Sequence, residues 1–370
     1  MRSTHWVSVL LLCAVGSCSN GNPAAPGANV PHLTFRGSCD ASAAVALSDD
    51  SFLVADDENN ILRLYRIADG SMPIRAFDLT AYLAIAPENP EADIEGATRV
   101  GDRIYWISSH GRNKDGKMRP NRYRFFATDI RGTGDEVSIR GVGKPCVTLA
   151  QSLVASPIGL QLGLDKATRL DDDLSKKERE RLASKEAGLN IEALAASPDG
   201  RTLYIGLRNP LLPMASSKRA IVIPLENAQA VIESSAAAQF GKAMLWDLGG
   251  RGLRSMEYCP QQKAFLLIAG DPDERDNFAL YRWSGEPAEA PTLAMLIKTG
   301  LPQFKPEALI PFGNRPELLI LSDDGAIEVK VAGPDDCIDP DEYNPSKGVC
   351  EQKFLRDAAR KTFRGIRLTP

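Results

Sequence analysis

The stretch GLNIEALAASPDGRTLYIGLRN, residues 188–209, decides the fold. A charged residue, Glu192, is followed by small and apolar residues, a Pro-Asp-Gly turn and an apolar strand that ends at Arg208. Four more copies of this pattern occur along the chain. The charged residues that open the five copies are Asp40, Glu95, Glu192, Arg254 and Glu307. Apart from one longer interval, the copies begin 53 to 62 residues apart, and repetition at such a period is typical of solenoids and propellers.

Strand-like runs continue between the copies. After 52–55, for example, come the alternating runs 61–65 and 74–77, each bounded by turn residues. About four strands over ~50 residues make up one blade of a propeller. The sequence therefore predicts an all-β protein: one β-propeller domain over residues 31–370, with five blades, or six as the alternative.

The last repeat offers too few strands. The runs 318–321 and 327–331 look like its second and third strands, and a fourth strand is missing. A strand from one end of the chain, either 32–35 or 363–366, could fill the place. Closure matters because an open ring would leave unpaired strand edges.

One interval, from Glu95 to Glu192, is much longer than the others. We interpret residues 146–188 as an insertion that carries a short surface helix, opening at a capping box between Ser175 and Glu178. A sixth, degenerate blade is the alternative interpretation.

The N-terminus has the form of an export signal. Arg2 precedes an apolar stretch, residues 7–15, that is too short to span a bilayer. Val15-Gly16-Ser17-Cys18 resembles a bacterial lipobox, which predicts a signal peptide over 1–18, a lipid on Cys18 and a flexible tether over 19–30; cleavage without a lipid is the alternative. We therefore expect a periplasmic or membrane-anchored protein that contacts the membrane only through this lipid.

Five cysteines follow Cys18, and an exported chain can oxidise them. Cys337 and Cys350 flank a loop rich in Asp, Pro, Asn and Gly, so we expect a disulfide there, within a C-terminal segment, 333–362, that also holds a short helix. The sequence does not assign partners to Cys39, Cys146 and Cys259.

The repeat also predicts a site. In a propeller the start of each first strand and the end of each second strand lie at one mouth of the channel, because the two strands are antiparallel. The predicted ligand-binding candidates share this position, and they are Asp40, Asp56, Asp57, Glu95, His110, Arg112, Glu192, Arg208, Asn209, Arg254, Glu307 and Asp323.

Confined carboxylates either pair with cations or raise one another's pKa. Three outcomes are therefore open for the ring: structural ion pairs with the arginines, a hard cation such as Ca²⁺, or a substrate with one carboxylate as acid or base. The segment 110–124 is rich in Lys and Arg and could fold over the mouth to contact phosphate or carboxylate groups. His110 could belong to such a site, or be a hydrogen-bonded structural residue.

Four stretches, 37–66, 93–130, 188–211 and 248–258, resemble a family of exported bacterial proteins without an established function, grouped with phytase-like and esterase-like propellers. The resemblance covers nearly all of 31–370 and implies a propeller. It supplies no catalytic residues.

Two functions compete. The first is a cell-envelope propeller that binds a small anionic ligand or an envelope protein, or acts as a scaffold. The second is a metal-assisted phosphoesterase or esterase with a carboxylate and Arg/His site. The net charge of −4 gives no indication of nucleic-acid binding. No nucleophile elbow and no zinc-ligand spacing occurs in the sequence.

Overall fold

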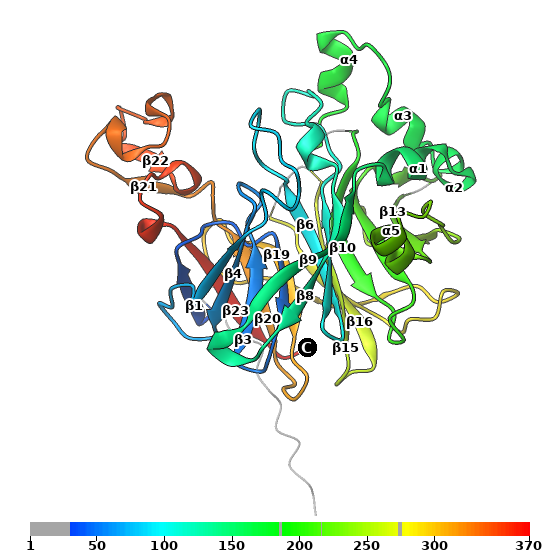
Figure 1. The fold of residues 1–370 in the computed structure, drawn as a ribbon, viewed down its shortest axis with the longest axis horizontal. Coiled ribbons are helices and arrows are strands. Elements are labelled where there is room, and N and C mark those ends of the chain that lie inside the picture. The colour runs from blue at the N-terminus through cyan, green and yellow to red at the C-terminus, as the bar shows by residue number, and fades with distance from the viewer. Residues whose placement is uncertain (1–29, 185–186, 216, 273–275) are drawn as a thin grey trace, which may run out of the picture.

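In the computed structural model the chain forms a ring of five antiparallel sheets, the blades of a β-propeller (Figure 1). The first strands of successive blades contact one another, and that of the fifth contacts that of the first, so the ring is closed. The structure describes residues 30–184, 187–215, 217–272 and 276–370, so the signal segment, Cys18 and residues 19–29 of the tether lie outside it. The predicted five-bladed all-β fold is confirmed.

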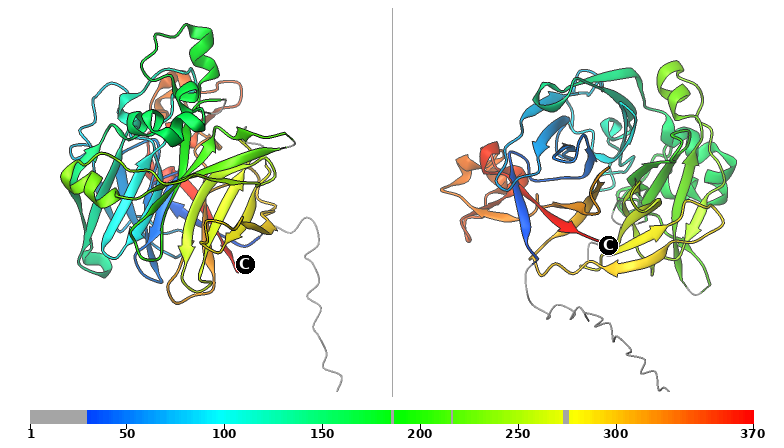
Figure 2. Two further views of the ribbon diagram at one scale, coloured as in Figure 1. Left: turned by 90° about the vertical axis from the view of Figure 1, so that its right-hand side faces the viewer. Right: turned by 90° about the horizontal axis from the view of Figure 1, so that it is seen from below.

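The strands follow the chain order in four of the blades. The colours in Figure 2 show that the blades also follow one another around the ring in chain order. Blade 1 contains β2 (Ala43–Ala46), β3 (Ser51–Ala55), β4 (Ile61–Arg66) and β5 (Arg75–Asp78). Blade 2 contains β6 (Ile94–Val100), β7 (Arg103–Ser108), β8 (Phe125–Arg131) and β9 (Ser138–Cys146). Blade 3 contains β10 (Asn190–Ala196), β11 (Leu203–Asn209), β13 (Lys218–Leu225) and β14 (Met244–Trp246), with the short β12 (Leu212–Pro213) beside β13. Blade 4 contains β15 (Gly252–Cys259), β16 (Ala264–Gly270), β17 (Ala279–Trp283) and β18 (Thr292–Leu296).

Both ends of the chain complete blade 5, in which β19 (Lys305–Pro311) and β20 (Leu318–Asp323) are followed by β23 (Thr362–Leu368) and then β1 (His32–Arg36). The two terminal runs are thus both used. The expectation that 327–331 is a blade strand is wrong, because β21 (Glu328–Lys330) pairs with β22 (Val349–Glu351) outside the ring. The C-terminal strand instead buries Phe363 and Ile366 completely in the seams on either side of the blade.

Among the described residues, the hydrophobic core of the ring is divided into five clusters, one in the seam between each pair of neighbouring blades, and a sixth, small cluster lies around Cys337 and Cys350. Each strand of a blade presents alternate residues to the two seams that flank it. On β7, for example, Trp106 packs toward blade 1 and Ile107 toward blade 3. The ring is therefore held together by side-chain packing between sheets.

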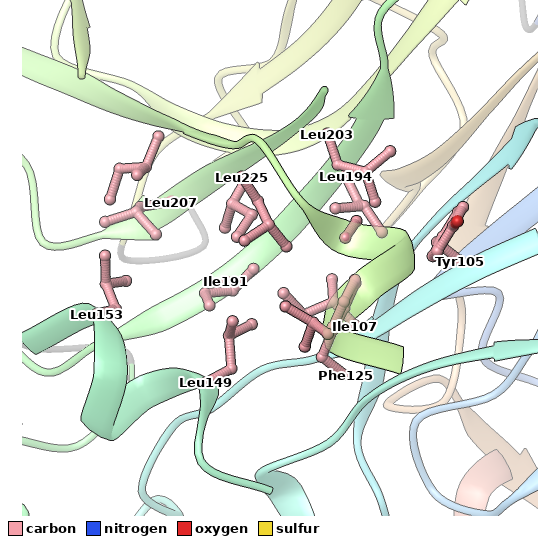
Figure 3. Close-up of a cluster of buried hydrophobic side chains, with 14 of the residues drawn as sticks. Tyr105, Ile107, Phe125, Leu149, Leu153, Ile191, Leu194, Leu203, Leu207 and Leu225 are labelled. Carbon is pink, nitrogen blue, oxygen red and sulfur yellow. The ribbon is translucent and has the colours of Figure 1, made fainter. Parts of the chain in front are cut away.

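Four short helices lie in the expected insertion, and there is no strand between β9 and residue 189 among the residues described there. They are α1 (Leu149–Ala155), α2 (Pro157–Gln161), α3 (Leu164–Thr168) and α4 (Lys176–Arg181). The first does more than cover the surface, since Leu149 and Leu153 pack against Ile191 and Leu207 of blade 3 (Figure 3). The capping box at Ser175 and Glu178 is confirmed at the start of α4, which has no buried residue.

The C-terminal arm, residues 325–361, leaves the ring after β20 and returns at β23. The predicted disulfide between Cys337 and Cys350 is present in it, whereas Cys39, Cys146 and Cys259 are free thiols. This arm and the insertion rise from the same side of the ring, at opposite flanks (Figure 1).

The remaining helices are short. They are α5 (Ala228–Ser234) and the 3₁₀ turns Pro120–Arg122, Gly134–Glu136, Pro334–Asp336, Pro340–Glu342, Gln352–Phe354 and Ala358–Arg360. Among the described residues, no helix has the length and apolar character needed to cross a membrane.

The burial of β23 in the ring predicts that this strand contributes strongly to stability. Phe363 is fully buried and stacks on Phe35, with ring centroids 5.0 Å apart. We expect Phe363→Ala to lower the free energy of unfolding by about 3–5 kcal/mol, because it leaves a cavity in the seam that joins blade 5 to blade 1. Denaturant unfolding would measure the change. Leu293→Ala, at a residue 54% exposed on β18, is the control and should change it by less than about 0.5 kcal/mol. Equal losses in the two variants would contradict the role of the closing strand.

Candidate functional site

A β-bulge places a charged side chain at the start of the first strand in four of the five blades. The pairing of β6 with β7 skips one residue between Ile94 and Gly96, and that residue is Glu95. The same irregularity leaves Glu192, Arg254 and Glu307 as the extra residue of their strands. A bulge re-aims the side chain of the extra residue and leaves that residue out of the ladder. The sequence repeat therefore encodes a repeated bulge. Asp40, the fifth residue of the ring, precedes β2 and lies outside any bulge.

These strand starts surround a cavity of about 400 Å³ at one mouth of the channel, which we call the acidic mouth. Its walls carry more acids than bases. The acids are Asp57, Glu58, Glu91, Asp93, Glu95, Glu192, Glu307 and Asp323. The bases are Lys114, Arg119, Arg122, Arg208 and Lys353. The insertion and the C-terminal arm both reach this cavity, the insertion through Ser184 and the arm through Lys353.

Two buried arginines neutralise one side of the acidic mouth. Arg208 donates a 2.8 Å hydrogen bond to Oε1 of Glu192. The guanidinium of Arg254, only 1% exposed, lies 2.5 Å from Oε1 of Glu307 and 3.4 Å from Oε2 of Glu192. Burial raises the pKa of Glu307 to about 8, although Arg254 acts in the opposite direction. This side of the mouth corresponds to the structural ion pairs that the sequence left open.

The rest of the acidic mouth is only partly neutralised. Arg122 lies 3.1 Å from Asp93, and Lys353 lies 3.1 Å from Glu58. Within the described part of the chain, neither Asp57 nor Glu95 has an ion pair, and Oδ1 of Asp57 is buried without a hydrogen-bond partner. Burial holds the pKa of both carboxyls well above the usual value, and neighbouring acids, chiefly Glu58 for Asp57 and Glu192 for Glu95, add to the effect.

The carboxylates form three groups whose oxygens lie within 4.8 Å of one another. The groups are Asp40, Asp57 and Glu58; Asp57, Asp93 and Glu95; and Glu95, Glu192 and Glu307. Since Ca²⁺ binds oxygen atoms at 2.3–2.6 Å, oxygens on opposite sides of one ion are about 4.6–5.2 Å apart. The spacing of these groups therefore fits a hard cation. The middle group fits best, because it contains both Asp57 and Glu95.

Several predicted site residues lie elsewhere. His110 is 1% exposed and outside the cavity, where its Nδ1 faces the Ser108 carbonyl oxygen at 2.8 Å and its ring packs against Tyr123. Burial lowers the pKa of His110 to about 4. The expectation that His110 belongs to the mouth is therefore wrong, since the ring is held by packing and its own backbone.

Arg112 and Asn209 also face away from the cavity. Arg112 donates hydrogen bonds to the carbonyl oxygens of Gly116, Thr168 and Arg169, and Asn209 donates to that of Ser184. Both side chains hold the insertion against the ring. They are structural residues, because the insertion offers backbone carbonyls that need donors.

The first blade contributes fewer side chains to the cavity than its sequence indicates. Asp40 and Asp56 are buried and do not line the cavity. A carboxylate oxygen of Asp40 accepts from the backbone N–H of Gly325 at 2.8 Å, and Asp56 accepts from Ser38 and lies 3.9 Å from Arg63. Asp57 and Glu58 are the residues of this turn that line the mouth. Asp323, in blade 5, lines the cavity as predicted by its repeat position.

Asp93 and Lys353 line the mouth but are not among the residues predicted from the sequence. Asp93 lies two residues before Glu95 and shares its side of the mouth, so the spacing Asp-x-Glu is a signal that could have found it. Lys353 comes from the C-terminal arm, and no repeat position indicates it. Of the basic segment 110–124, Lys114, Arg119 and Arg122 line the mouth.

A family model matches residues 40–125 and 155–322, which is more than half of the chain. The chain belongs to DUF3616, a family of proteins of unknown function. No curated protein matches its sequence.

Solved structures similar to this DUF3616 protein share little sequence with it. An oxidoreductase described as a glucose dehydrogenase from Thermus thermophilus is 12% identical, with 91% of this chain and 100% of that chain covered and a TM-score of 0.39. The β-propeller domain of Cps50 (Swd1) from Myceliophthora thermophila is 9% identical, with 80% and 96% covered and a TM-score of 0.35. A streptogramin B lyase is 9% identical, with 81% and 83% covered and a TM-score of 0.35.

The buried arginine predicts a large stability effect. Arg254→Ala would leave Glu192 and Glu307 with less positive charge around them in a buried site. We expect the free energy of unfolding to fall by about 3–5 kcal/mol at pH 8, measured by denaturant. Arg66→Ala, which removes an exposed partner of Asp135, is the control and should cost about 0–1 kcal/mol. A loss below 1 kcal/mol for Arg254→Ala would mean that the pairs do not stabilise the mouth.

The raised pKa values of the buried carboxyls predict that the stability of the protein depends on pH. The pKa values of Glu307, Glu95 and Asp57 are higher in the folded protein than in the unfolded chain, so the folded state binds more protons above about pH 5. Stability must then fall as pH rises toward 8. With a chelator present, we expect the melting temperature to decrease between pH 5 and 8.

Glu95→Gln should make the melting temperature decrease less steeply with pH, because the variant has one carboxyl with a raised pKa fewer. Glu88→Gln, at an exposed position, should leave the slope unchanged. A melting temperature that rises over the same interval would contradict the proposed electrostatics of the mouth.

Proposed function

We propose that this protein is a ligand-binding propeller whose acidic mouth holds a divalent cation. The cation, together with the basic residues Lys114 and Arg119 at the rim of this mouth, binds a small anion. One observation carries the proposal: Asp57 and Glu95 lie in the same group of carboxylates, and neither forms an ion pair within the described chain. Crowded carboxylates either take up protons or recruit a cation. Ca²⁺ fits the group, because all of its donors are carboxylate oxygens.

The anion is suggested by the bases of the rim. Lys114 and Arg119 line the cavity, and no ion pair involves either of them within the described residues. A cation bound by Asp57, Asp93 and Glu95 would offer its remaining coordination positions toward the cavity. Arginine and lysine side chains nearby favour phosphate or carboxylate groups as the anion.

The cation is tested directly. Calorimetric titration of the propeller domain, residues 30–370, at pH 7.5 should show Ca²⁺ binding. Saturating Ca²⁺ should also raise the melting temperature of this domain. Glu95→Gln and Asp57→Asn should each weaken Ca²⁺ binding by about tenfold or more, because each removes one carboxylate ligand. Glu91→Gln is the matched control: it removes the same charge from the same cavity, at a residue outside the three groups.

Three results would each count against the proposal. The first is no Ca²⁺ binding to the folded protein at millimolar concentration. The second is equal losses in Glu95→Gln and Glu91→Gln, which would indicate a general field rather than a site. The third is inorganic phosphate that binds equally well with Ca²⁺ and with a chelator.

A hydrolase is the second candidate. It is favoured by the same juxtaposition of carboxylates and basic residues, since a metal beside a phosphate can polarise it and activate water. His110 is not part of it, because that side chain is buried outside the cavity. Turnover of phosphomonoesters, phytate or aryl esters that requires Ca²⁺ and is lost in Glu95→Gln would establish the hydrolase. Cation binding without turnover would leave a binding protein.

We also propose that the chain is exported and anchored in a bacterial envelope through a lipid on Cys18. The apolar stretch 7–15 and the lipobox-like residues before Cys18 support it. Cys18→Ser should move the protein from the membrane fraction to the soluble periplasmic fraction. Unchanged fractionation of that variant would argue against the anchor.

A further inference from the structure

The second mouth of the channel, opposite the acidic mouth, holds another cavity. It lies where the five first strands end and turn into the second strands, and its volume is about 610 Å³. Every blade contributes to its walls, through Val45, Arg99, Ser197, Glu257 and Leu309 in chain order. The function proposed for the acidic mouth makes no use of this cavity.

Glu257 reaches across the channel. It lies on β15 of blade 4, and its Oε1 accepts a 3.1 Å hydrogen bond from Oγ1 of Thr98, on β6 of blade 2. Blade 3 lies between these two blades in the ring, so the bond crosses the inside of the channel. The Thr98 hydroxyl also accepts from the backbone N–H of Ala196, at 2.9 Å, which fixes its orientation. The remaining oxygen of Glu257, Oε2, has no hydrogen bond within the described chain.

The other ionisable groups of this cavity are Asp49, Arg99 and Tyr258. Arg99 donates to the carbonyl oxygens of Ala46, Leu47 and Gly101, and Asp49 accepts from Asn314. Among the described residues, no basic side chain pairs with Glu257. Burial raises the pKa of this carboxyl well above its usual value, opposed only by the Thr98 hydrogen bond.

Neither acid of this cavity, Asp49 or Glu257, thus pairs with a basic side chain among the described residues, and the walls expose somewhat more apolar than polar surface. With Glu257 ionised, the lining carries two acids and one base, so it is one positive charge short. A metal ion is not favoured, because Glu257 belongs to no group of three potential metal ligands among the described residues. Val45, Leu309 and the ring of Tyr258 offer contact area to an apolar body.

We propose that the second mouth binds an organic ammonium ion: a primary amine on a small apolar body, with the ammonium at the carboxylate of Glu257. The ammonium supplies the missing charge and donates to Oε2 of Glu257. The apolar body lies against the walls, and Tyr258 adds a cation–π or stacking contact. This site is independent of the acidic mouth, since it lies at the other end of the channel.

Benzylamine hydrochloride is the probe. We expect it to bind the folded wild-type protein with a Kd of about 1 mM or lower, by calorimetry. Benzyl alcohol, which has the same body without the charge, and ammonium chloride, which has the charge without the body, should each bind at least about tenfold more weakly. Affinity for benzylamine should rise with pH until Glu257 is ionised in the free protein, because the amine stays charged and only the carboxylate binds it.

Glu257→Gln keeps the volume and the Thr98 contact but removes the charge. It should weaken benzylamine binding by about tenfold to a hundredfold and abolish the pH dependence. Asp49→Asn, which removes the other carboxylate of this cavity, and Glu95→Gln, at the acidic mouth, are the controls and should change Kd by less than about threefold.

The proposal is overturned if benzylamine fails to bind the folded wild-type protein at about 10 mM. It is also overturned if Glu257→Gln, shown by its melting curve to be folded, binds benzylamine as well as the wild type. Equal binding of benzyl alcohol would mean that the cavity takes apolar bodies only, and that Glu257 is a neutral structural acid. None of these outcomes depends on whether the acidic mouth binds Ca²⁺.

Discussion

The convergence of five strand starts on one axis is the constraint from which the rest of this structure follows. A closed ring forces the first strand of every blade toward the channel, where little room is left for side chains. In four blades a bulge at that point turns one long charged residue toward the axis. The backbone therefore concentrates charge at one mouth, and the protein must balance that charge with partners, protons or a bound ion.

The balance is uneven, and the unevenness gives the mouth its chemical character. Arg208 and Arg254 form buried ion pairs with Glu192 and Glu307. Next to them, Asp57 and Glu95 face the cavity without such partners among the described residues. A purely structural ring would not need this difference. We take it as the physical basis for a cation site, with the basic residues of the rim positioned to attract an anion.

The two ends of the channel differ because the strands that form them differ in residue type along their length. A charged residue lies near the start of each first strand, and most of the residues that follow it are small or apolar. The strand ends therefore make a cavity that is wider and more apolar than the acidic mouth. Arg99 and Glu257 are the charged exceptions near these strand ends, and a carboxyl without a basic partner is costly to ionise in such surroundings unless something positive accompanies it.

Much of the fold was predictable from sequence, because a blade is a local unit. Alternating runs and turn residues locate the strands, and the repeated charged residue locates the bulge beside the channel. The capping box of α4 and the disulfide between Cys337 and Cys350 are local in the same sense: their residues lie close together in the chain.

Tertiary structure decided what depends on contacts between distant segments. The run 327–331 has a good strand pattern, yet the ring is closed by the two ends of the chain, which bury Phe35, Phe363 and Ile366 in the seams. His110 has the position of a site residue, but the backbone turns its ring into the core. Lys353 and Arg122 reach the mouth from segments outside the repeat. Sequence alone determined which residue types arrive at the axis, since strand periodicity is local; only the closed ring decided which charges are paired, because pairing depends on distances across the channel.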